Sequence, residues 1–238
     1  MKSCAFFDID GTLLNGFIIQ SFPRYLADNG IIESRYSDKI DKIVGRYDAN
    51  LISYREAALT IPQLVAISIR GRGEKEIRQQ AKEFMKEYVP HTILGFAEDL
   101  INEVKGRVDL TIALSGSPIE AVKELHGLGF DFEYGTLFEV ENSMYTGKIE
   151  ANLILGEVKA EHVMKIVESH DVDLERTVAF GDSDQDVRTL ELVGLPIALN
   201  PSEAMKEICM MRGWRLYNKE TMDVEEIIDL IKQLMRLC

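Results

Sequence analysis

The stretch "AFFDIDGTLLNG", residues 5–16, begins as an apolar strand and then places two carboxylates, Asp8 and Asp10, two positions apart. A glycine and a threonine, Gly11 and Thr12, follow at once and indicate a turn. Two acids held close together at the end of a buried strand repel each other, so they need a positive charge between them. The rest of the chain must therefore supply the partners of this acid pair.

The composition is typical of a globular protein that buries a core. Of the 238 residues, 46% are hydrophobic and 28% are charged, and no segment is repetitive. The formal net charge of −13 disfavours nucleic acid and anionic membrane surfaces as partners. The same charge would repel a small anionic substrate, so a site for such a substrate must carry its own local cations.

Several features predict a cytoplasmic protein that makes no contact with membranes. The longest apolar run, residues 61–69, is too short to span a bilayer, and acids interrupt the N-terminal apolar stretch too early for a signal peptide. Three cysteines, Cys4, Cys209 and Cys238, have neither the pattern of a disulfide framework nor that of a zinc site. The four histidines also lack the spacing of metal ligands. The oligomeric state stays open.

Short apolar runs alternate with helical patterns over most of the chain. Strands are expected at residues 3–9, 108–114, 132–137, 176–181, 195–199 and 214–217. Helical patterns lie between them, for example at residues 117–127 and 157–170, and a final amphipathic helix is expected over residues 224–235. This alternation predicts an α/β fold with a doubly wound, Rossmann-like parallel sheet that helices cover on both faces.

Residues 15–89 interrupt the alternation, because they show helical patterns only, near residues 17–29, 36–47, 53–69 and 73–88. Such a block between the first and second strands predicts a small helical-bundle cap over the carboxyl edge of the sheet. We therefore expect a catalytic core formed by residues 1–14 and 90–238, and a helical cap domain formed by residues 15–89. Residues 138–149 alternate on both sides of an Asn-Ser turn and predict a hairpin.

Polar side chains gather where the expected strands end. In a doubly wound sheet, the loops after the strands meet at one edge, and ligands bind there. Asp8 and Asp182 follow neighbouring strands, so their carboxylates should face each other, and hard oxygen ligands of this kind suit Mg²⁺. A metal ion at this edge would supply the positive charge that the acid pair needs.

Groups that can bind an anion lie at the same edge. The Ser115 hydroxyl and the Gly116 N–H, at the expected start of a helix, can donate hydrogen bonds to an anion. Lys159, at the start of another helix, adds a full positive charge. Together with the metal, these groups predict a site for a phosphoryl group.

Four segments of this chain resemble the motifs of the haloacid dehalogenase (HAD) superfamily, and within it the phosphoserine-phosphatase-like branch with a helical cap after the first strand. The four motifs are matched, in order, by "CAFFDIDGT", "IALSGS", "GEVKAEHV" and "GDSDQD". The resemblance covers the whole chain. It implies a phosphatase that uses Mg²⁺ and acts on a small phosphorylated metabolite.

The resemblance also implies roles for individual residues. Asp8 would attack phosphorus and become an aspartyl-phosphate, while Asp10 would protonate the leaving oxygen and later activate water. Ser115, Gly116 and Lys159 would bind the phosphoryl group. The metal ligands that the resemblance implies are Asp8 through its carboxylate, Asp10 through its backbone carbonyl, Asp182, and Asp186, which steadies the shell.

Simpler roles and other functions stay open for this set of residues. Ser115 could merely cap a helix that begins near Ser117. Lys159 could be a solvated helix residue, with Lys165 as the alternative ligand. A phosphotransferase or mutase could use the same aspartyl-phosphate and pass the phosphoryl group to another alcohol. A non-enzymatic, receiver-like signalling domain is a further alternative.

The expected cap matches phosphoserine phosphatases poorly. In that branch a glutamate nine residues after the nucleophile binds the substrate's amino group, and a cap arginine binds its carboxylate. The corresponding residues here are Phe17 and Ile61, and Arg55, Arg70 and Arg72 remain candidates for contact with an anion. Aromatic residues of the expected cap, most of which we expect in its core, could line an apolar pocket: Phe17, Phe22, Tyr25, Tyr47 and Tyr54.

Overall fold

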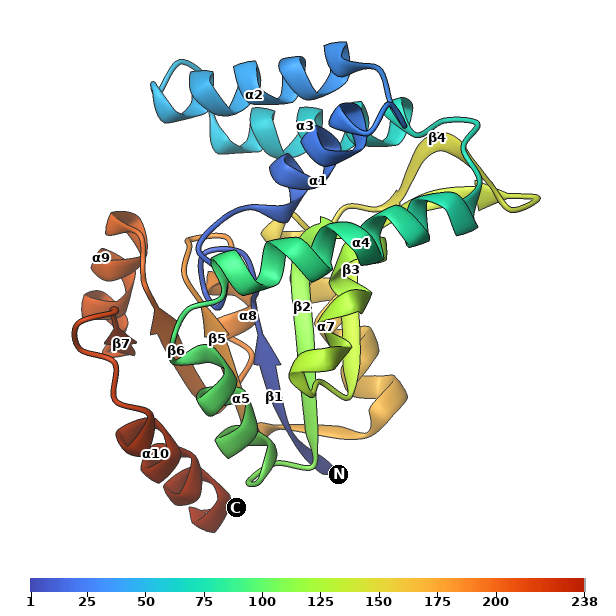
Figure 1. Ribbon diagram of the computed structural model, residues 1–238. Coiled ribbons are helices and arrows are strands. Elements are labelled where there is room, and N and C mark those ends of the chain that lie inside the picture. The colour runs from blue at the N-terminus through green and yellow to red at the C-terminus, as the bar shows by residue number, and fades with distance from the viewer. Residues whose placement is uncertain (238) are drawn as a thin grey trace.

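A mostly parallel seven-stranded sheet forms the centre of the computed structural model, which describes residues 1–237 (Figure 1). The strand order is β4-β3-β2-β1-β5-β6-β7, and only the β3–β4 pair is antiparallel. The predicted doubly wound α/β fold is therefore confirmed. The strands are β1 (Lys2–Phe7), β2 (Leu110–Pro118), β3 (Phe132–Glu141), β4 (Met144–Ala151), β5 (Val172–Gly181), β6 (Leu195–Leu199) and β7 (Arg215–Tyr217).

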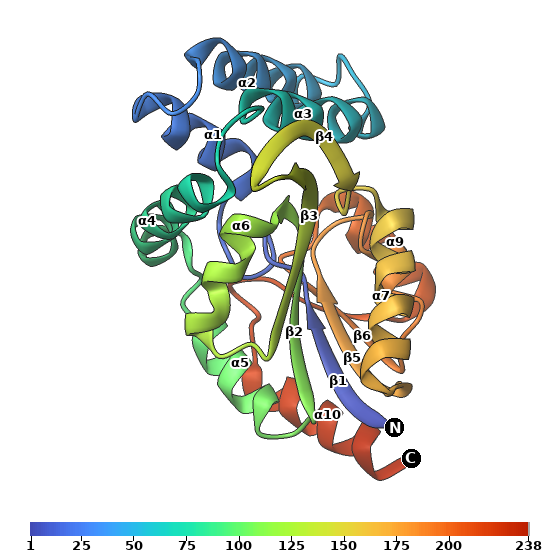
Figure 2. The same ribbon diagram turned by 90° about the vertical axis from the view of Figure 1, so that its right-hand side faces the viewer.

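β1 lies in the middle of the sheet because successive residues of this strand are apolar on both faces. Phe7 belongs to a core cluster shared with α5 (Ala97–Lys105), α6 (Ile119–Val122) and α10 (Val224–Leu237). Cys4 and Phe6 point to the other face, where they pack in a second cluster with residues of α7 (Gly156–His170), α8 (Val187–Leu190) and α9 (Glu203–Arg212). Figure 2 shows α5 and α6 on one side of the sheet and α7 and α9 on the other.

The chain between β1 and α5 forms four helices at the carboxyl end of the sheet, α1 (Ile18–Asp28), α2 (Ser34–Asp48), α3 (Tyr54–Ser68) and α4 (Glu74–Thr92). Of these, α1, α2 and α3 lie beyond the strands and α4 runs alongside their ends (Figure 1). The four predicted helical patterns are thus confirmed. We keep the name cap for residues 15–89, and the division into two domains at these bounds stays a prediction.

Backbone hydrogen bonds join the cap to the core at two places. Where the chain enters and leaves the cap, Asn15 N donates to Thr92 O at 2.7 Å, and Leu94 N donates to Leu13 O at 2.9 Å. At the far side, Gly71 N donates to Tyr145 O at 2.8 Å, which ties the cap to the β3–β4 hairpin. The predicted hairpin is confirmed, and both residues of its Asn142–Ser143 turn have the positive φ that such turns require.

The predicted helix over residues 117–127 is wrong at its start. Ser117 and Pro118 continue β2, and Pro118 pairs with Thr136 of β3, so the helix begins only at Ile119. After one turn of α-helix, the chain continues as a 3₁₀-helix, η1 (Lys123–Leu128). Ser115 and Gly116 therefore lie in the extended end of a strand, not at the start of a helix.

Among the residues that the structure describes, no helix is both long and apolar enough to cross a membrane. Cys4 and Cys209 are buried free thiols on the same face of the sheet. Cys238 lies outside the described residues.

The ring of Phe7 packs between two other aromatic rings in the core and should stabilise the fold. It is fully buried and stacks on Phe180 of β5 with ring centroids 4.6 Å apart, while Phe130 packs against its edge at 5.5 Å. We expect Phe7→Ala to lower the free energy of unfolding in urea by about 3–5 kcal/mol, because it leaves a cavity at the centre of the sheet. Met210→Ala, at a side chain 75% exposed, is the control, and a loss at Phe7 no larger than at Met210 would contradict this packing.

Candidate active site

The loop that follows β1 turns sharply between the acid pair and the cap. Asp8 N still donates to Phe180 O at 2.9 Å, which fixes the first acid beside the end of β5. Gly11 then adopts a φ of +86°, a conformation that favours glycine. A Cβ at Gly11 would overlap the Asp182 carboxylate, so glycine is also the only residue that leaves room for this acid.

Lys159 lies between two buried carboxylates. Its Nζ is 2.6 Å from Asp8 Oδ1 and 2.6 Å from Asp186 Oδ1. Lys159 is only 4% exposed, whereas Lys165 is exposed on the outside of α7, so the alternative of a solvated Lys159 is wrong. A buried lysine with two acid partners is a strong constraint, because removal of the lysine would leave two buried carboxylates without their shared cation.

The hydroxyl of Thr12 completes the surroundings of Asp8. It donates to Asp8 Oδ2 at 2.9 Å and lies 3.4 Å from Asp182 Oδ1. Local sequence predicts only a turn at Thr12, although its position in the first motif is a signal for a role at the site. Thr12 therefore links the two acids that were expected to face each other.

Three carboxylates, those of Asp8, Asp182 and Asp186, offer oxygens that all lie within 4.8 Å of one another. Both carboxylate oxygens of Asp186 already have protein partners. One oxygen contacts Lys159, and the other accepts hydrogen bonds from Asp182 N and from Ser183. Asp182 has no closer side-chain donor than Thr12 at 3.4 Å among the described residues. The pair that best fits as direct ligands of a hard cation is thus Asp8 and Asp182.

The electrostatics of this cluster favour the binding of a cation. Burial raises the pKa of Asp8 to about 7, against the effect of Lys159. Burial also raises the pKa of Asp182 well above its usual value, and the charges of Asp8 and Asp186 add to this shift. Although burial alone would lower it, the pKa of Lys159 is raised by the charges of Asp186 and Asp8. Three acids thus share one ammonium group, and a divalent cation would relieve the remaining repulsion.

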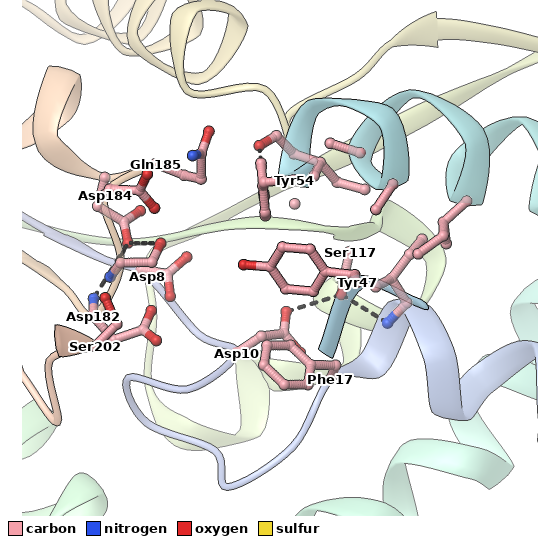
Figure 3. Close-up of a pocket in the computed structure, with 18 of the residues that line it drawn as sticks. Asp8, Asp10, Phe17, Tyr47, Tyr54, Ser117, Asp182, Asp184, Gln185 and Ser202 are labelled. Carbon is pink, nitrogen blue, oxygen red and sulfur yellow. Dashed lines mark hydrogen bonds between the residues drawn. The ribbon is translucent and has the colours of Figure 1, made fainter. Parts of the chain in front are cut away.

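Asp10 points away from this cluster and toward the cap. Its Oδ1 accepts a hydrogen bond from Ile18 N at 2.7 Å, at the start of α1, and its Oδ2 accepts from the Ser115 and Ser117 hydroxyls, each at 2.8 Å. Figure 3 shows the bond between Ser117 and Asp10. Burial raises the pKa of Asp10, and these hydrogen bonds oppose the shift. Ser117 also accepts from Ile19 N at 3.0 Å, so one serine ties the acid to the cap helix.

The two predicted anion-binding residues at the end of β2 have different surroundings. Ser115 is fully buried, donates to Asp10 and accepts from Ser117 N at 2.9 Å, so it caps no helix. Gly116 does line the cavity described below, and a Cβ there would lie 2.9 Å from Ile154 Cγ1. The role of Ser117 does not follow from the sequence, because the local pattern predicts a helix over this serine.

A cavity of about 450 Å³ opens between the acid cluster and the cap. Its floor is polar and its walls are mostly apolar, and Figure 3 shows the Phe17 and Tyr47 rings across from Asp8 and Asp182. The lining residues that come from the cap are Phe17, Ile19, Gln20, Val44, Tyr47, Asp48, Tyr54, Ala57, Ala58 and Ile61. Of Phe17, Phe22, Tyr25, Tyr47 and Tyr54, only Phe22 and Tyr25 pack on Phe84 inside the cap, so the expectation that most of these five aromatic residues form the cap core is wrong.

Comparison with known proteins gives a consistent result. The family model for haloacid dehalogenase-like hydrolases matches residues 5–191. Phosphoserine phosphatase SerB1 of Mycobacterium tuberculosis is 25% identical over 224 residues, which cover 91% of this chain and 70% of that protein. A histidinol-phosphatase of Neisseria meningitidis is 24% identical over 226 residues, which cover 92% of this chain and 99% of that protein.

A similar solved structure is a phospho-aspartyl intermediate analogue of phosphoserine phosphatase. It has a TM-score of 0.65 and is 23% identical, and the match covers 96% of this chain and 98% of that one. A likeness of this kind shows that the two chains share their fold.

The raised pKa of Asp8 links metal binding to pH. Folded, metal-free protein retains a proton on this acid up to about pH 7, whereas the unfolded chain loses it near pH 4, so stability without metal falls as the pH rises through this interval. Mg²⁺ must displace that proton, and its stabilising effect should therefore grow with pH. We expect excess Mg²⁺ to raise the thermal midpoint more at pH 8 than at pH 5.5.

The control for this measurement is Asp182→Asn, which removes one oxygen ligand and should abolish the pH-dependent increment. An equal increment at both pH values in the unchanged protein, or an increment that Asp182→Asn retains in full, would contradict a Mg²⁺ site at these acids.

Proposed function

We propose that this chain, which belongs to the haloacid dehalogenase-like hydrolase family, hydrolyses a small-molecule phosphomonoester with Mg²⁺ and through a phosphorylated Asp8. The family predicted from the four motifs is confirmed, and it favours an enzyme over the receiver-like alternative. The observation that carries the proposal is the convergence of Asp8, Lys159 and Asp182 at the floor of a cavity large enough for a small ester.

Asp8 is the proposed nucleophile. A carboxylate attacks a phosphate dianion poorly unless nearby positive charge reduces the repulsion between them. Lys159, 2.6 Å from Asp8 Oδ1, supplies one such charge, and the Thr12 hydroxyl orients the other oxygen of Asp8. Mg²⁺ bound by the Asp8 and Asp182 carboxylates and the Asp10 backbone carbonyl would add the Lewis-acid charge that the anionic phosphoryl group needs.

Asp10 is the proposed general acid and base. Its raised pKa favours the protonated form that can donate to the leaving oxygen, and the resulting carboxylate can then accept a proton from the attacking water. Both of its oxygens accept hydrogen bonds in the structure, from Ile18 N, Ser115 and Ser117. One acid can thus serve both half-reactions, provided that it turns from these donors toward the substrate.

The proposed phosphoryl-binding groups are Lys159 and the Gly116 N–H, which both border the cavity. Ser115 enters the proposal in a different role from the one first expected. It lies behind Asp10 and donates to it, so it positions the acid and does not face the cavity.

The proposed substrate is a small phosphorylated metabolite of the cytoplasm, and its alcohol need not resemble serine. Phe17 and Ile61 line the cavity where phosphoserine phosphatases need a charged partner, and neither can bind an ammonium or carboxylate group by charge. None of the three candidate arginines borders the cavity: Arg55 contacts Glu157, Arg72 contacts Glu76, and Arg70 lies against Gly147.

Replacement of the nucleophile should stop turnover. We expect Asp8→Asn to lose more than about nine-tenths of the activity while the far-ultraviolet circular dichroism stays unchanged, because one change removes the attacking oxygen and a metal ligand. Asp28→Asn, at an exposed acid that does not line the cavity, is the matched control. Release of inorganic phosphate, compared with phosphorylated acceptor in added alcohol, separates hydrolysis from phosphotransfer. A folded Asp8→Asn protein with near-normal activity would contradict the proposal.

Asp10→Asn should separate the two half-reactions. A good leaving group such as p-nitrophenolate needs little protonation, so the variant should still become phosphorylated by p-nitrophenyl phosphate and then hydrolyse slowly. Rapid-mixing measurements should show a burst of p-nitrophenolate close to one equivalent per enzyme. Absence of the burst in folded protein would assign Asp10 a structural role.

We expect that phosphoserine is not strongly preferred over other small phosphomonoesters. Its carboxylate would be desolvated without a basic partner, so we expect its kcat/KM advantage over glycerol phosphates and sugar phosphates to stay below about tenfold. Phe17→Glu should improve phosphoserine hydrolysis, since it places a carboxylate where phosphoserine phosphatases bind the ammonium group. A preference of more than about a hundredfold for phosphoserine would show that another side chain binds the amino-acid end.

A further inference from the structure

The wall of the cavity opposite the acid cluster is aromatic. Phe17 precedes α1, Tyr47 lies near the end of α2, and Tyr54 begins α3. The Tyr47 and Tyr54 rings form an edge-to-face pair with centroids 5.9 Å apart. Phe17 and Tyr47 remain 55% and 40% exposed, so packing inside the cap leaves much of each ring accessible. We call these three residues the aromatic wall.

Acids accompany the aromatic wall. Asp48 follows Tyr47 in α2, and Asp184 comes from the loop after β5, so the two approach the cavity from the cap and from the core. Both acids line the same cavity as Tyr47, and their charges add to the effect of burial in raising the pKa of Tyr47. Asp184 and Asp48 are exposed and contact no basic side chain among the described residues.

The same cavity offers almost no positive charge. Lys159 is the only lysine or arginine among its lining residues in the described part of the chain, and Asp8 and Asp186 already hold its ammonium group. Gln20, the one lining amide on the cap side, donates to Asp41 at 3.1 Å. A second anionic group on the substrate would therefore meet acids and aromatic faces, which both repel it.

We infer that the site selects phosphomonoesters whose alcohol carries an ammonium or quaternary ammonium group and no second anion. Aromatic faces attract such cations, and this attraction grows when the cation is desolvated in a pocket. Asp48 and Asp184 add attraction by charge at the same end of the cavity. The inference rests on the proposed phosphatase activity and names the class of its substrate.

Two matched pairs of esters test each half of this inference by steady-state kinetics. Phosphocholine and 3,3-dimethylbutyl phosphate have the same shape and differ in the positive charge, and we expect a kcat/KM ratio of about tenfold in favour of phosphocholine. Phosphoethanolamine and L-phosphoserine differ in the carboxylate, and we expect phosphoethanolamine to be hydrolysed at least about tenfold better.

Variants show whether the named residues cause the preference. Tyr47→Leu and Asp184→Asn should each lower the ratio of phosphocholine to 3,3-dimethylbutyl phosphate toward one. A ratio within one preparation is independent of the fraction of folded protein. Tyr36→Leu in the same helix and Asp28→Asn are the matched controls, since neither residue lines the cavity, and both should keep the ratio of the unchanged protein.

The outcomes distinguish the inference from the function on which it rests. If p-nitrophenyl phosphate and all four esters resist hydrolysis in Mg²⁺, the proposed phosphatase activity fails, and the inference fails with it. If the esters are hydrolysed but the neutral ester matches phosphocholine, or phosphoserine matches phosphoethanolamine, the phosphatase activity stands and the inference alone is overturned. Equal ratios in Tyr47→Leu and Tyr36→Leu would also overturn it.

Discussion

One buried ammonium group holds the site together. Lys159 contacts Asp8 and Asp186 at 2.6 Å each, in a place where an unpaired charge would be costly. This contact requires β1 and β5 to be neighbours and α7 to begin at the same edge of the sheet, which the strand order provides. Because three carboxylates share this single lysine, the cluster is left with an excess of negative charge that a divalent cation can balance.

The cap depends on the same loop as the chemistry. Asp10 accepts a hydrogen bond from the first turn of α1, and Ser117 bonds both to Asp10 and to Ile19 N, so the proposed general acid also anchors the cap. The β3–β4 hairpin holds the far side of the cap by backbone hydrogen bonds. The core thus supplies the charged floor of the cavity and the cap supplies its aromatic wall, and differences among relatives in substrate are expected to arise in the cap.

Local sequence patterns were sufficient to predict the sheet, the four cap helices and the hairpin. The acid cluster was also predictable, because Asp8, Lys159, Asp182 and Asp186 each follow or open a regular element at one edge. The helix start near Ser117 was wrong, since pairing with β3 keeps this segment extended. The hydrogen bonds that Asp10 accepts from Ser115, Ser117 and Ile18 could not be predicted, because they join the loop after β1 to the end of β2 and to the cap, contacts that no local pattern specifies.

The central claim is that the Asp8 carboxylate receives the phosphoryl group. The most direct measurement mixes the Mg²⁺-loaded protein with excess p-nitrophenyl phosphate, quenches it in acid within the first turnover, and maps the added mass by peptide mass spectrometry. The account predicts one phosphoryl adduct on the peptide that contains Asp8, lost when neutral hydroxylamine cleaves the acyl phosphate. An adduct on another residue, or rapid turnover with no adduct at any quench time, would contradict it.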